Sequence, residues 1–445
     1  MSKSSLPPPF AGTCAALATL AGLLASAPAQ AVNLSQTGQG QVLIFPYYSV
    51  HEGNDTNLSI VNRTDQAKAV LVRFREARQA DAVLTFSLFL AAHDQWVGAV
   101  TATEDVAKLI SADPSCTLPT VPDQGLEFDR RLEAISGDGE REESRTRSGY
   151  IEVIEMGVVS DPTVLATLSG SGAQGSARRC DVSLLNRDMG PQQGVRALLP
   201  PSGGLTGGAT LINVMAGTEY NIEPVVLEDF SSINLWPKDF SFSTDLPNLS
   251  SVNPRTSLVL ANGKAVRSTW DQGEDAISAL LMHISLVNEI VLEPSTQSRT
   301  DWVVTLPTRH FYVSSAPDSA RAPFTLDSGA GRLCQAAREI TRSRDAAIAT
   351  APLAHRLCWG TTNVLPFDYD RYQHLTDRSF VFTNGWGELM FDNNSELVSR
   401  EGHLYYGLPV TGFMMHNFVN GNVNGLLSNY GGNFQHKYTT LIEAP

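Results

Sequence analysis

The sequence predicts a mainly β protein built from two antiparallel β-sandwich domains, with long loops and one or two short helices. Apolar and polar residues alternate with a period of two far more often than with the helical period of about 3.6. Clusters of Gly, Pro, Asn and Asp separate these runs at about ten-residue spacing, as in sandwich sheets. Apolar residues make up 42% of the 445 residues, which is enough to fill substantial cores.

The first segment of the chain is typical of a secretory signal peptide. A lone positive charge at Lys3 precedes an apolar run over residues 15–25, and small residues frame the end of the segment at 29–31. That order predicts a signal peptide over residues 1–31 and a mature chain that begins at Val32. Lipidation at Cys14 is the alternative, although the apolar run continues beyond this cysteine. The mature protein is therefore expected in the periplasm, at the cell surface or outside the cell.

Charge and hydropathy exclude several classes of protein. The chain has a net charge of −14, and loss of the predicted signal peptide leaves 31 basic against 46 acidic residues, a net charge of −15. Such an acidic chain lacks the basic surface that nucleic acids require, so no nucleic-acid partner is expected. The mature chain also contains no uninterrupted apolar segment of the roughly 18 residues that a membrane-spanning helix needs.

The first predicted domain covers residues 32–235. Residues 67–76 alternate so that Arg73 and Arg75 lie on the solvent face of a half-buried strand, and residues 83–90 and 58–61 also predict strands. We expect four strands between residues 42 and 100 to form one antiparallel sheet. A segment over about 113–148 changes to prolines and dense mixed charge, which predicts an exposed excursion. Further strand patterns follow at 150–159 and 209–230.

The second predicted domain covers residues 236–445. Two stretches in it look helical, 275–283 and 331–349. The segment 409–441 is rich in Asn-Gly and Gly-Gly pairs between short apolar runs, which predicts tight hairpins.

The cysteines predict two disulfides. Four remain after the signal peptide, and an even number in an exported chain favours a disulfide framework. We expect Cys116 to pair with Cys180 and Cys334 with Cys358, because each pair then closes one irregular excursion within one domain. The alternative pairings would connect the two domains.

Catalytic and cofactor motifs are missing from the sequence. No GxSxG, HExxH, CxxC or nucleotide-binding glycine motif stands in the required context, so the sequence predicts no catalytic residue, no metal ligand and no cofactor. Aromatic side chains are the remaining candidates, because their faces bind sugars and protein partners alike. The candidate interaction aromatics are Tyr47, Tyr48, Trp236, Trp386, Tyr405 and Tyr406.

Four segments resemble a family of exported proteobacterial proteins of unknown function. They are GQVLIFPYYSV at 40–50, VRFREAR at 72–78, DWVVTLPTRHFYV at 301–313 and GLPVTGF at 407–413. The overall pattern of strands and turns is similar to that of bacterial secreted proteins with immunoglobulin-like sandwiches. The resemblance implies immunoglobulin-like domains and export, and it carries no catalytic signature.

These observations favour a non-catalytic structural or interaction protein of the periplasm or cell surface. Its expected partner is a protein or a cell-envelope polysaccharide. The alternative is a carbohydrate-binding protein or a glycoside hydrolase. An enzyme should hold carboxylates beside exposed aromatics in one cleft, whereas an interaction module should present a flat face or an open strand edge.

Overall fold

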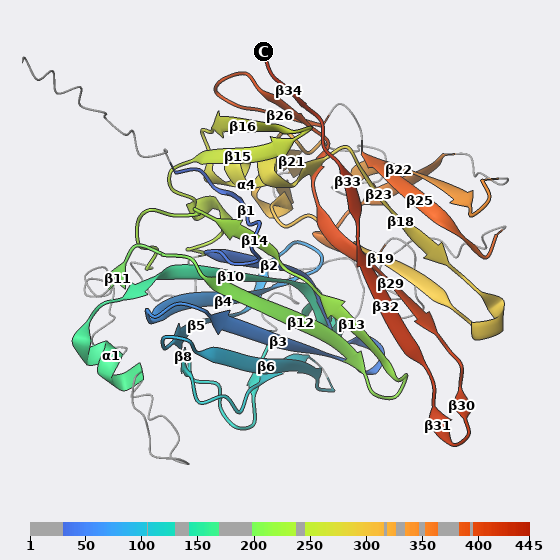
Figure 1. Cartoon of the computed structure of the whole chain (residues 1–445), viewed down its shortest axis with the longest axis horizontal. Helices are drawn as coiled ribbons and strands as arrows, with labels where there is room; N and C mark the ends of the chain where they lie inside the picture. Colours follow the sequence, from blue (N-terminus) through green and yellow to red (C-terminus); the bar gives the residue numbers. More distant parts are fainter. Residues whose placement is uncertain are drawn as a thin grey trace, which may run out of the picture.

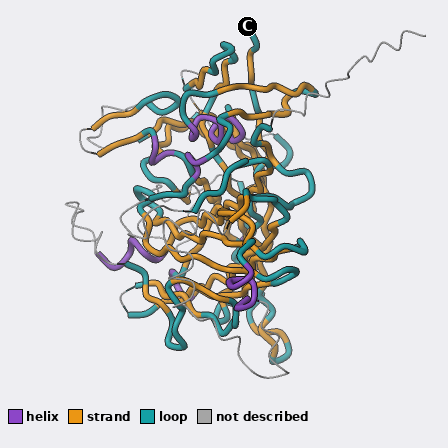
Figure 2. Tube along the Cα trace, turned by 90° about the vertical axis from the view of Figure 1, so that its left-hand side faces the viewer, coloured by secondary structure: helices purple, strands orange, loops and turns teal. Residues whose placement is uncertain are grey.

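A computed structural model describes residues 30–104, 106–129, 142–168, 198–236, 245–315, 318–325, 334–346, 352–363, 382–391 and 395–445. Strands dominate this part of the chain, and every ladder between its strands is antiparallel (Figures 1 and 2). The predicted mainly β class is confirmed. Its immunoglobulin-like character stays a prediction.

Two sheets form the first sandwich, at the lower left of Figure 1. The larger has the order β1-β14-β2-β10-β4-β5-β8, with β11 beside β10, and the smaller has the order β13-β12-β3-β6-β7-β9. The strands of the larger sheet are β1 (Asn33–Leu34), β2 (Val42–Ser49), β4 (Lys68–Glu76), β5 (Ala82–Leu90), β8 (Cys116–Leu118), β10 (Ser148–Val159), β11 (Leu198–Leu199) and β14 (Val225–Glu228). Those of the smaller sheet are β3 (Asn54–Asn62), β6 (Gln95–Ala102), β7 (Ala107–Ile110), β9 (Leu126–Glu127), β12 (Leu205–Asn213) and β13 (Thr218–Ile222).

The second sandwich lies to the right in Figure 1 and also contains two sheets, with the orders β23-β22-β25-β18-β33 and β24-β19-β29-β32. The strands of its first sheet are β18 (Ser285–Val291), β22 (Gln335–Ser343), β23 (Leu353–Leu357), β25 (Asn384–Phe391) and β33 (Lys437–Thr439). Those of its second sheet are β19 (Arg299–Thr305), β24 (Thr361–Asn363), β29 (Thr411–Phe418) and β32 (Tyr430–Gln435).

A third layer covers the outer face of the larger sheet. It contains the helix α4 (Gly273–Leu281) and the hairpin of β15 (Thr256–Ala261) and β16 (Lys264–Thr269). The smaller pairs are β17 (Met282–His283) with β28 (Leu408–Pro409), β20 (Val313–Ser315) with β21 (Asp318–Ala320), β30 (Asn422–Val423) with β31 (Leu426–Leu427), and β27 (Leu404–Tyr406) with β26 (Glu396–Val398) and β34 (Ile442–Glu443). The remaining helical segments are α1 (Pro162–Leu168), η1 (His51–Gly53), η3 (Glu142–Arg147), η4 (Leu249–Ser251), η5 (Pro294–Thr296) and η6 (Arg309–Phe311).

The hydrophobic core crosses the predicted domain boundary at 235/236. The core between the two sheets of the first sandwich also contains Val303, Phe413 and Met415 of the second sandwich. A second core lies beneath the third layer, where Trp236 packs at the boundary itself. The first sandwich is therefore completed by side chains from the other half of the chain. The division into separate domains stays a prediction.

The predicted start of the mature chain is part of the fold. Val32 is fully buried, its backbone N–H donates to the carbonyl of Thr256 at 2.8 Å, and its own carbonyl accepts from Leu258 at 2.9 Å. Residues 1–29 lie outside the described residues, so the signal peptide itself stays a prediction.

Several element predictions are corrected by the structure. Residues 335–343 form strand β22 and not a helix, while the helix predicted at 275–283 is confirmed as α4. The inward face of β22 holds Ala337, Glu339 and Thr341. Because two of these buried residues are polar, the strand shows no alternation of apolar and polar residues in the sequence. Five strands, not four, lie between residues 42 and 102, and they are divided between two sheets.

Charged positions that were predicted to face solvent are buried in two segments. Strand β4 is buried at every position, because residues 245–251 cover the part of its outer face that carries Arg73 and Arg75. In the charged excursion, Arg145 and Thr146 are buried at the end of the segment, although residues 130–141 lie outside the described residues. The cause is the same in both cases: the charged side chains have buried partners.

Candidate functional site

A cluster of buried charges, which we call the arginine clasp, lies on the outer face of the larger sheet. It consists of Arg73, Arg75, Glu152 and Asp245. Strand register creates it, because Arg73 on β4 lies opposite Glu152 on β10 and Arg75 lies opposite Tyr150. Residues two apart on a strand share a face, so these side chains project together from the sheet.

Glu152 bridges the two guanidinium groups of the arginine clasp. One carboxylate oxygen lies 2.8 Å from Nε of Arg75 and the other lies 3.5 Å from Nη1 of Arg73. Asp245 accepts two hydrogen bonds from Nη2 of Arg75, at 2.9 and 3.0 Å. Both arginines and Glu152 are at most 2% exposed, whereas the Asp245 side chain is 44% exposed.

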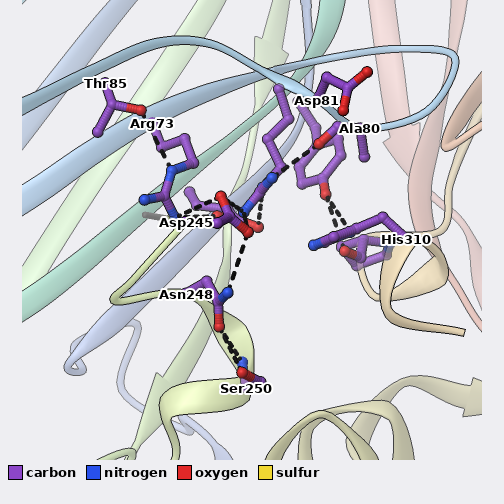
Figure 3. Close-up of polar contacts among 12 residues, drawn as sticks. Arg73, Ala80, Asp81, Thr85, Asp245, Asn248, Ser250 and His310 are labelled. Carbon is purple, nitrogen blue, oxygen red and sulfur yellow. Dashed lines mark hydrogen bonds and ion pairs between the residues drawn. The ribbon is translucent and has the colours of Figure 1, made fainter. Parts of the chain in front are cut away.

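Backbone and neutral groups complete the arginine clasp. Arg73 donates to the carbonyl of Pro247 at 2.8 Å, and Arg75 donates to that of Ala80 at 2.8 Å. The amide of Asn248, the residue before η4, donates to Asp245 at 3.1 Å, while its oxygen accepts from the backbone N–H of Ser250 within η4 (Figure 3). The cluster thereby holds residues 245–251 against β4.

A second contact connects the arginine clasp region to η6. The hydroxyl of Tyr150 donates to the carbonyl of Pro307 at 2.9 Å and lies 3.4 Å from Nδ1 of His310 (Figure 3). Burial and the nearby arginine charges lower the pKa of His310 well below its ordinary value, so the imidazole is neutral at pH 7. Burial and the Glu152 charge raise the pKa of the Tyr150 hydroxyl, which stays protonated.

Neighbouring charges shift the pKa values of Arg73, Arg75 and Asp245 in the arginine clasp. Burial alone would raise the pKa of Asp245, but the charges of Arg75 and Arg73 lower it below its ordinary value. Burial lowers the pKa of Arg73, and the charge of Arg75 adds to this effect. Burial also acts to lower the pKa of Arg75, but Glu152, Tyr150 and Asp245 together outweigh burial and raise this pKa. Each charged group thus has an opposite charge as its partner, and Glu152 lies out of reach of solvent. We interpret the clasp as a structural connection between β4, β10 and η4.

Two further buried ion pairs brace the same sheet. Lys68 lies 2.6 Å from Glu155, which also accepts from the backbone N–H groups of Ser202 and Gly203. Arg145 lies 3.1 Å from Glu76. These pairs fasten the loop after β11 and the segment η3 to β4 and β10.

The two sandwiches meet along a seam. The hydroxyl of Thr305 on β19 donates to the carbonyl of Pro46 on β2 at 2.6 Å, and the rings of Tyr47 and Phe413 lie 6.4 Å apart. All four segments that resemble exported proteobacterial proteins contribute to this region. A cavity of about 30 Å³ in the seam, with Asp301 in its lining, has room for about one or two water molecules.

The predicted interaction aromatics do not form a shared surface. Tyr47, Tyr48, Trp236 and Tyr405 are at most 4% exposed, because each projects into a core. The prediction is wrong for these four rings. Trp386 on β25 is half-buried, with the guanidinium of Arg342 5.9 Å from its ring centre. Tyr406 on β27 is also half-buried and donates to Glu443 at 3.0 Å, and it belongs to a different sheet.

The predicted disulfide between Cys334 and Cys358 is confirmed. It joins the start of β22 to the end of β23, two neighbouring strands of one sheet. Cys116 is buried on β8, and Cys180 lies outside the described residues. The pairing of Cys116 with Cys180 therefore stays a prediction.

Exposed apolar side chains gather at one end of the molecule, in a feature that the sequence reading missed. We call it the apolar tip and define it as Val214, Met215, Val423, Leu426, Leu427 and Tyr430. Met215 is 87% exposed, Val214 75% and Leu426 72%. The first two lie in the turn between β12 and β13, and the others lie in and beside the hairpin β30–β31, which projects from the body at the lower right of Figure 1.

Local sequence explains how the hairpin of the apolar tip forms. Val423 pairs with Leu426, so the loop has two residues, Asn424 and Gly425, with φ of 53° and 84°. Positive φ at both positions is the geometry of a type I′ turn, which favours Asn-Gly. The predicted tight hairpin is confirmed here.

Asparagine side chains fasten the two halves of the apolar tip together. The amide of Asn429 donates to the carbonyl of Ala216 at 2.9 Å, and its oxygen accepts from the N–H of Gly421 at 2.9 Å. Asn433 on β32 accepts from and donates to the backbone of Asn221 on β13. The turn and the hairpin therefore form one unit, although they come from different sandwiches.

Charge is missing from the segments that build the apolar tip. Residues 402–436 contain no Asp, Glu, Lys or Arg, and neither do residues 205–218. A count of charges along the sequence would have revealed both segments. The adjacent pair Leu426 and Leu427, directly after Asn-Gly, was the other available signal, because an apolar pair beside a hairpin turn has little chance of burial.

A buried histidine in the second sandwich makes a prediction about pH. Burial lowers the pKa of His436 from 6.5 to about 4, although its hydrogen bond to the carbonyl of Val303 acts in the opposite direction. The unfolded chain therefore binds a proton more readily, and stability falls as the pH drops from about 6.5 to about 4. At pH 5 this single group should reduce the free energy of unfolding by about 2 kcal/mol.

The variant His436→Gln should lose less stability than the wild type between pH 7 and pH 5, by about the same 2 kcal/mol. Urea unfolding at the two pH values measures the difference. Because Asn288 donates to Nδ1 of His436 at 3.0 Å and Nε2 lies 3.0 Å from the Val303 carbonyl, only the neutral ring fits both partners. An equal acid loss in both proteins would contradict this assignment.

Comparisons with known protein families, curated proteins and solved structures find no match for the chain. Among the described residues, no group of three or more His, Cys, Asp and Glu side chains is placed to hold a metal ion. No helix in the described part of the chain is long and apolar enough to cross a membrane. The function must therefore be argued from the residues themselves.

Proposed function

We propose that this chain is an exported, non-catalytic interaction protein that binds its partner through the apolar tip. The observation that carries the proposal is the concentration of exposed apolar side chains at one projecting end. Soluble proteins seldom expose large apolar side chains together unless the surface is used for binding. The disulfide between Cys334 and Cys358 is compatible with an oxidising compartment, and the resemblance to exported proteobacterial proteins is part of the same proposal.

The alternative of a carbohydrate-binding protein or hydrolase has less support. Four of the six candidate aromatics are buried, and the other two lie in different sheets. The buried carboxylate of Glu152 is closed off by two arginines. A sugar needs an open aromatic face beside polar groups, and the seam cavity of about 30 Å³ is too small for a sugar ring.

Binding of the exported chain to the cell envelope tests the proposal. Wild type should be retained on isolated envelopes of the producing cell, and the triple variant Met215→Ser, Leu426→Ser, Leu427→Ser should be retained roughly tenfold less. Leu260→Ser on β15 is the matched control, because this leucine is 65% exposed at the opposite end of the molecule.

Equal retention of the triple variant and wild type would overturn the proposed role of the apolar tip. Two results together would favour the carbohydrate alternative: soluble envelope polysaccharide abolishes the retention of wild type, and the variant Trp386→Ala is not retained. Circular dichroism of each variant confirms that the fold is kept, as expected for substitutions at exposed positions.

A further inference from the structure

We infer that the partner of the apolar tip is the surface of a lipid bilayer with neutral headgroups, which the tip enters to a shallow depth. This inference rests on the proposed function and names the chemistry of its partner. It is carried by three observations: the shape of the tip, the absence of charge from the segments that build it, and the way its backbone groups are satisfied.

The shape of the apolar tip suits a deformable partner. The hairpin β30–β31 projects beyond the sandwich, and the neighbouring turn presents Met215 and Val214 beside it (Figure 1). Gly217, at φ of 65°, leaves room for Leu427, since a Cβ there would lie 2.7 Å from the leucine Cδ2. The two apolar loops are thus packed against each other and form one convex projection. A convex projection buries its leucines in lipid, whereas a flat protein face would leave most of their surface exposed.

The absence of charge removes the main obstacle to insertion. Burial of a charged side chain in hydrocarbon is unfavourable by several kcal/mol, and no ionisable residue of Asp, Glu, Lys or Arg type occurs over residues 402–436 or 205–218. The nearest acid on β13 is the exposed Glu219, directly behind the turn. Tyr430 follows the hairpin at 51% exposure, and tyrosine is enriched at the level of lipid headgroups.

Backbone groups of the β30–β31 hairpin in the apolar tip have partners within the protein. Gly421 donates to the side chain of Asn429, and the N–H of Ser428 donates to the carbonyl of Gly421 at 2.8 Å. The amide of Asn420 donates to the carbonyl of Ser428 at 3.0 Å. Unsatisfied backbone groups oppose entry into lipid, so this internal pairing allows the hairpin to leave water.

Net charge selects the lipid class. The chain carries −14 overall, and no Lys or Arg lies within the two segments that form the tip. Anionic lipids attract basic segments and repel acidic proteins. We therefore assign zwitterionic lipid as the partner.

Flotation of the purified protein with phosphatidylcholine vesicles tests this inference. Wild type should float with the vesicles, and the double variant Leu426→Asp, Leu427→Asp should show a partition coefficient at least roughly tenfold lower. The matched control Leu260→Asp should float as wild type does. Replacement of part of the phosphatidylcholine by phosphatidylglycerol should weaken binding at low salt, because the protein is acidic.

Three results would overturn the lipid assignment. They are a wild type that stays unbound to neutral vesicles, binding that requires anionic lipid, and a control variant that loses binding as strongly as the double variant. Sedimentation analysis tests the alternative that a second copy of the chain covers the tip. A wild-type dimer that dissociates in the double variant would support this alternative. Envelope retention that depends on the tip, without vesicle binding, would leave the proposed function intact and reject only the lipid partner.

Discussion

Replacement of Glu152 by glutamine is expected to lower the free energy of unfolding by about 3–5 kcal/mol, because it removes one partner of a buried ionic cluster. Glu152 is fully buried and lies between Arg73 and Arg75. In Glu152→Gln the two guanidinium groups keep one carboxylate, Asp245, whose side chain is 44% exposed and screened by water. Two like charges would then face each other in a desolvated site.

Urea unfolding at pH 7 measures this loss. Asp245→Asn should have a smaller effect, because solvent already weakens its interaction with the arginines. Glu104→Gln, at an exposed position, is the matched control and should change stability by less than about 0.5 kcal/mol. If Glu152→Gln behaved like the exposed control, the clasp would contribute nothing to the connection between β4 and η4.

Removal of the disulfide in the double variant Cys334→Ser, Cys358→Ser is expected to reduce the free energy of unfolding by about 3–4 kcal/mol. The bond closes a separation of 24 residues, and loss of such a closure returns conformational entropy to the unfolded chain. The double variant is compared with wild type by urea unfolding without reductant, which leaves any other disulfide intact.

Peptide mapping under non-reducing conditions provides the companion measurement. A peptide that joins Cys334 to Cys358 is expected, as is one that joins Cys116 to Cys180. A stability equal to wild type in the double variant would mean that the pairing of β22 with β23 already restricts this loop in the unfolded chain.

Strand patterns along the sequence predicted much of the fold but little of the site. Alternation of apolar residues located β4 and β5, because one face of each meets a continuous core. The same alternation placed Arg73 and Arg75 in solvent, since the period of two reveals which residues share a face and not what covers it. The covering residues 245–251 lie far along the chain, and only tertiary structure brings them to the arginines.

Four of the six aromatic candidates are buried for a related reason. Tyr48 and Tyr405 are buried because their strands turn them inward, and composition alone does not indicate which way a side chain points.

The apolar tip shows the reverse case, in which apolar side chains are exposed and the sequence did not predict it. Leu426 and Val423 belong to strands of two residues each, which are too short for an alternation pattern to be recognised. The Asn-Gly turn was read correctly, whereas the exposure of its neighbours needed the structure.

The seam between the sandwiches determines when folding can finish. Thr305 reaches Pro46 across 259 residues of sequence, and Tyr150 reaches Pro307 across 157. Contacts over such separations close late, because the intervening chain must first be ordered. The first half emerges from synthesis without Val303, Phe413 and Met415, which complete its core. Until the last strands arrive, that half exposes apolar surface, which makes the incomplete chain prone to aggregation.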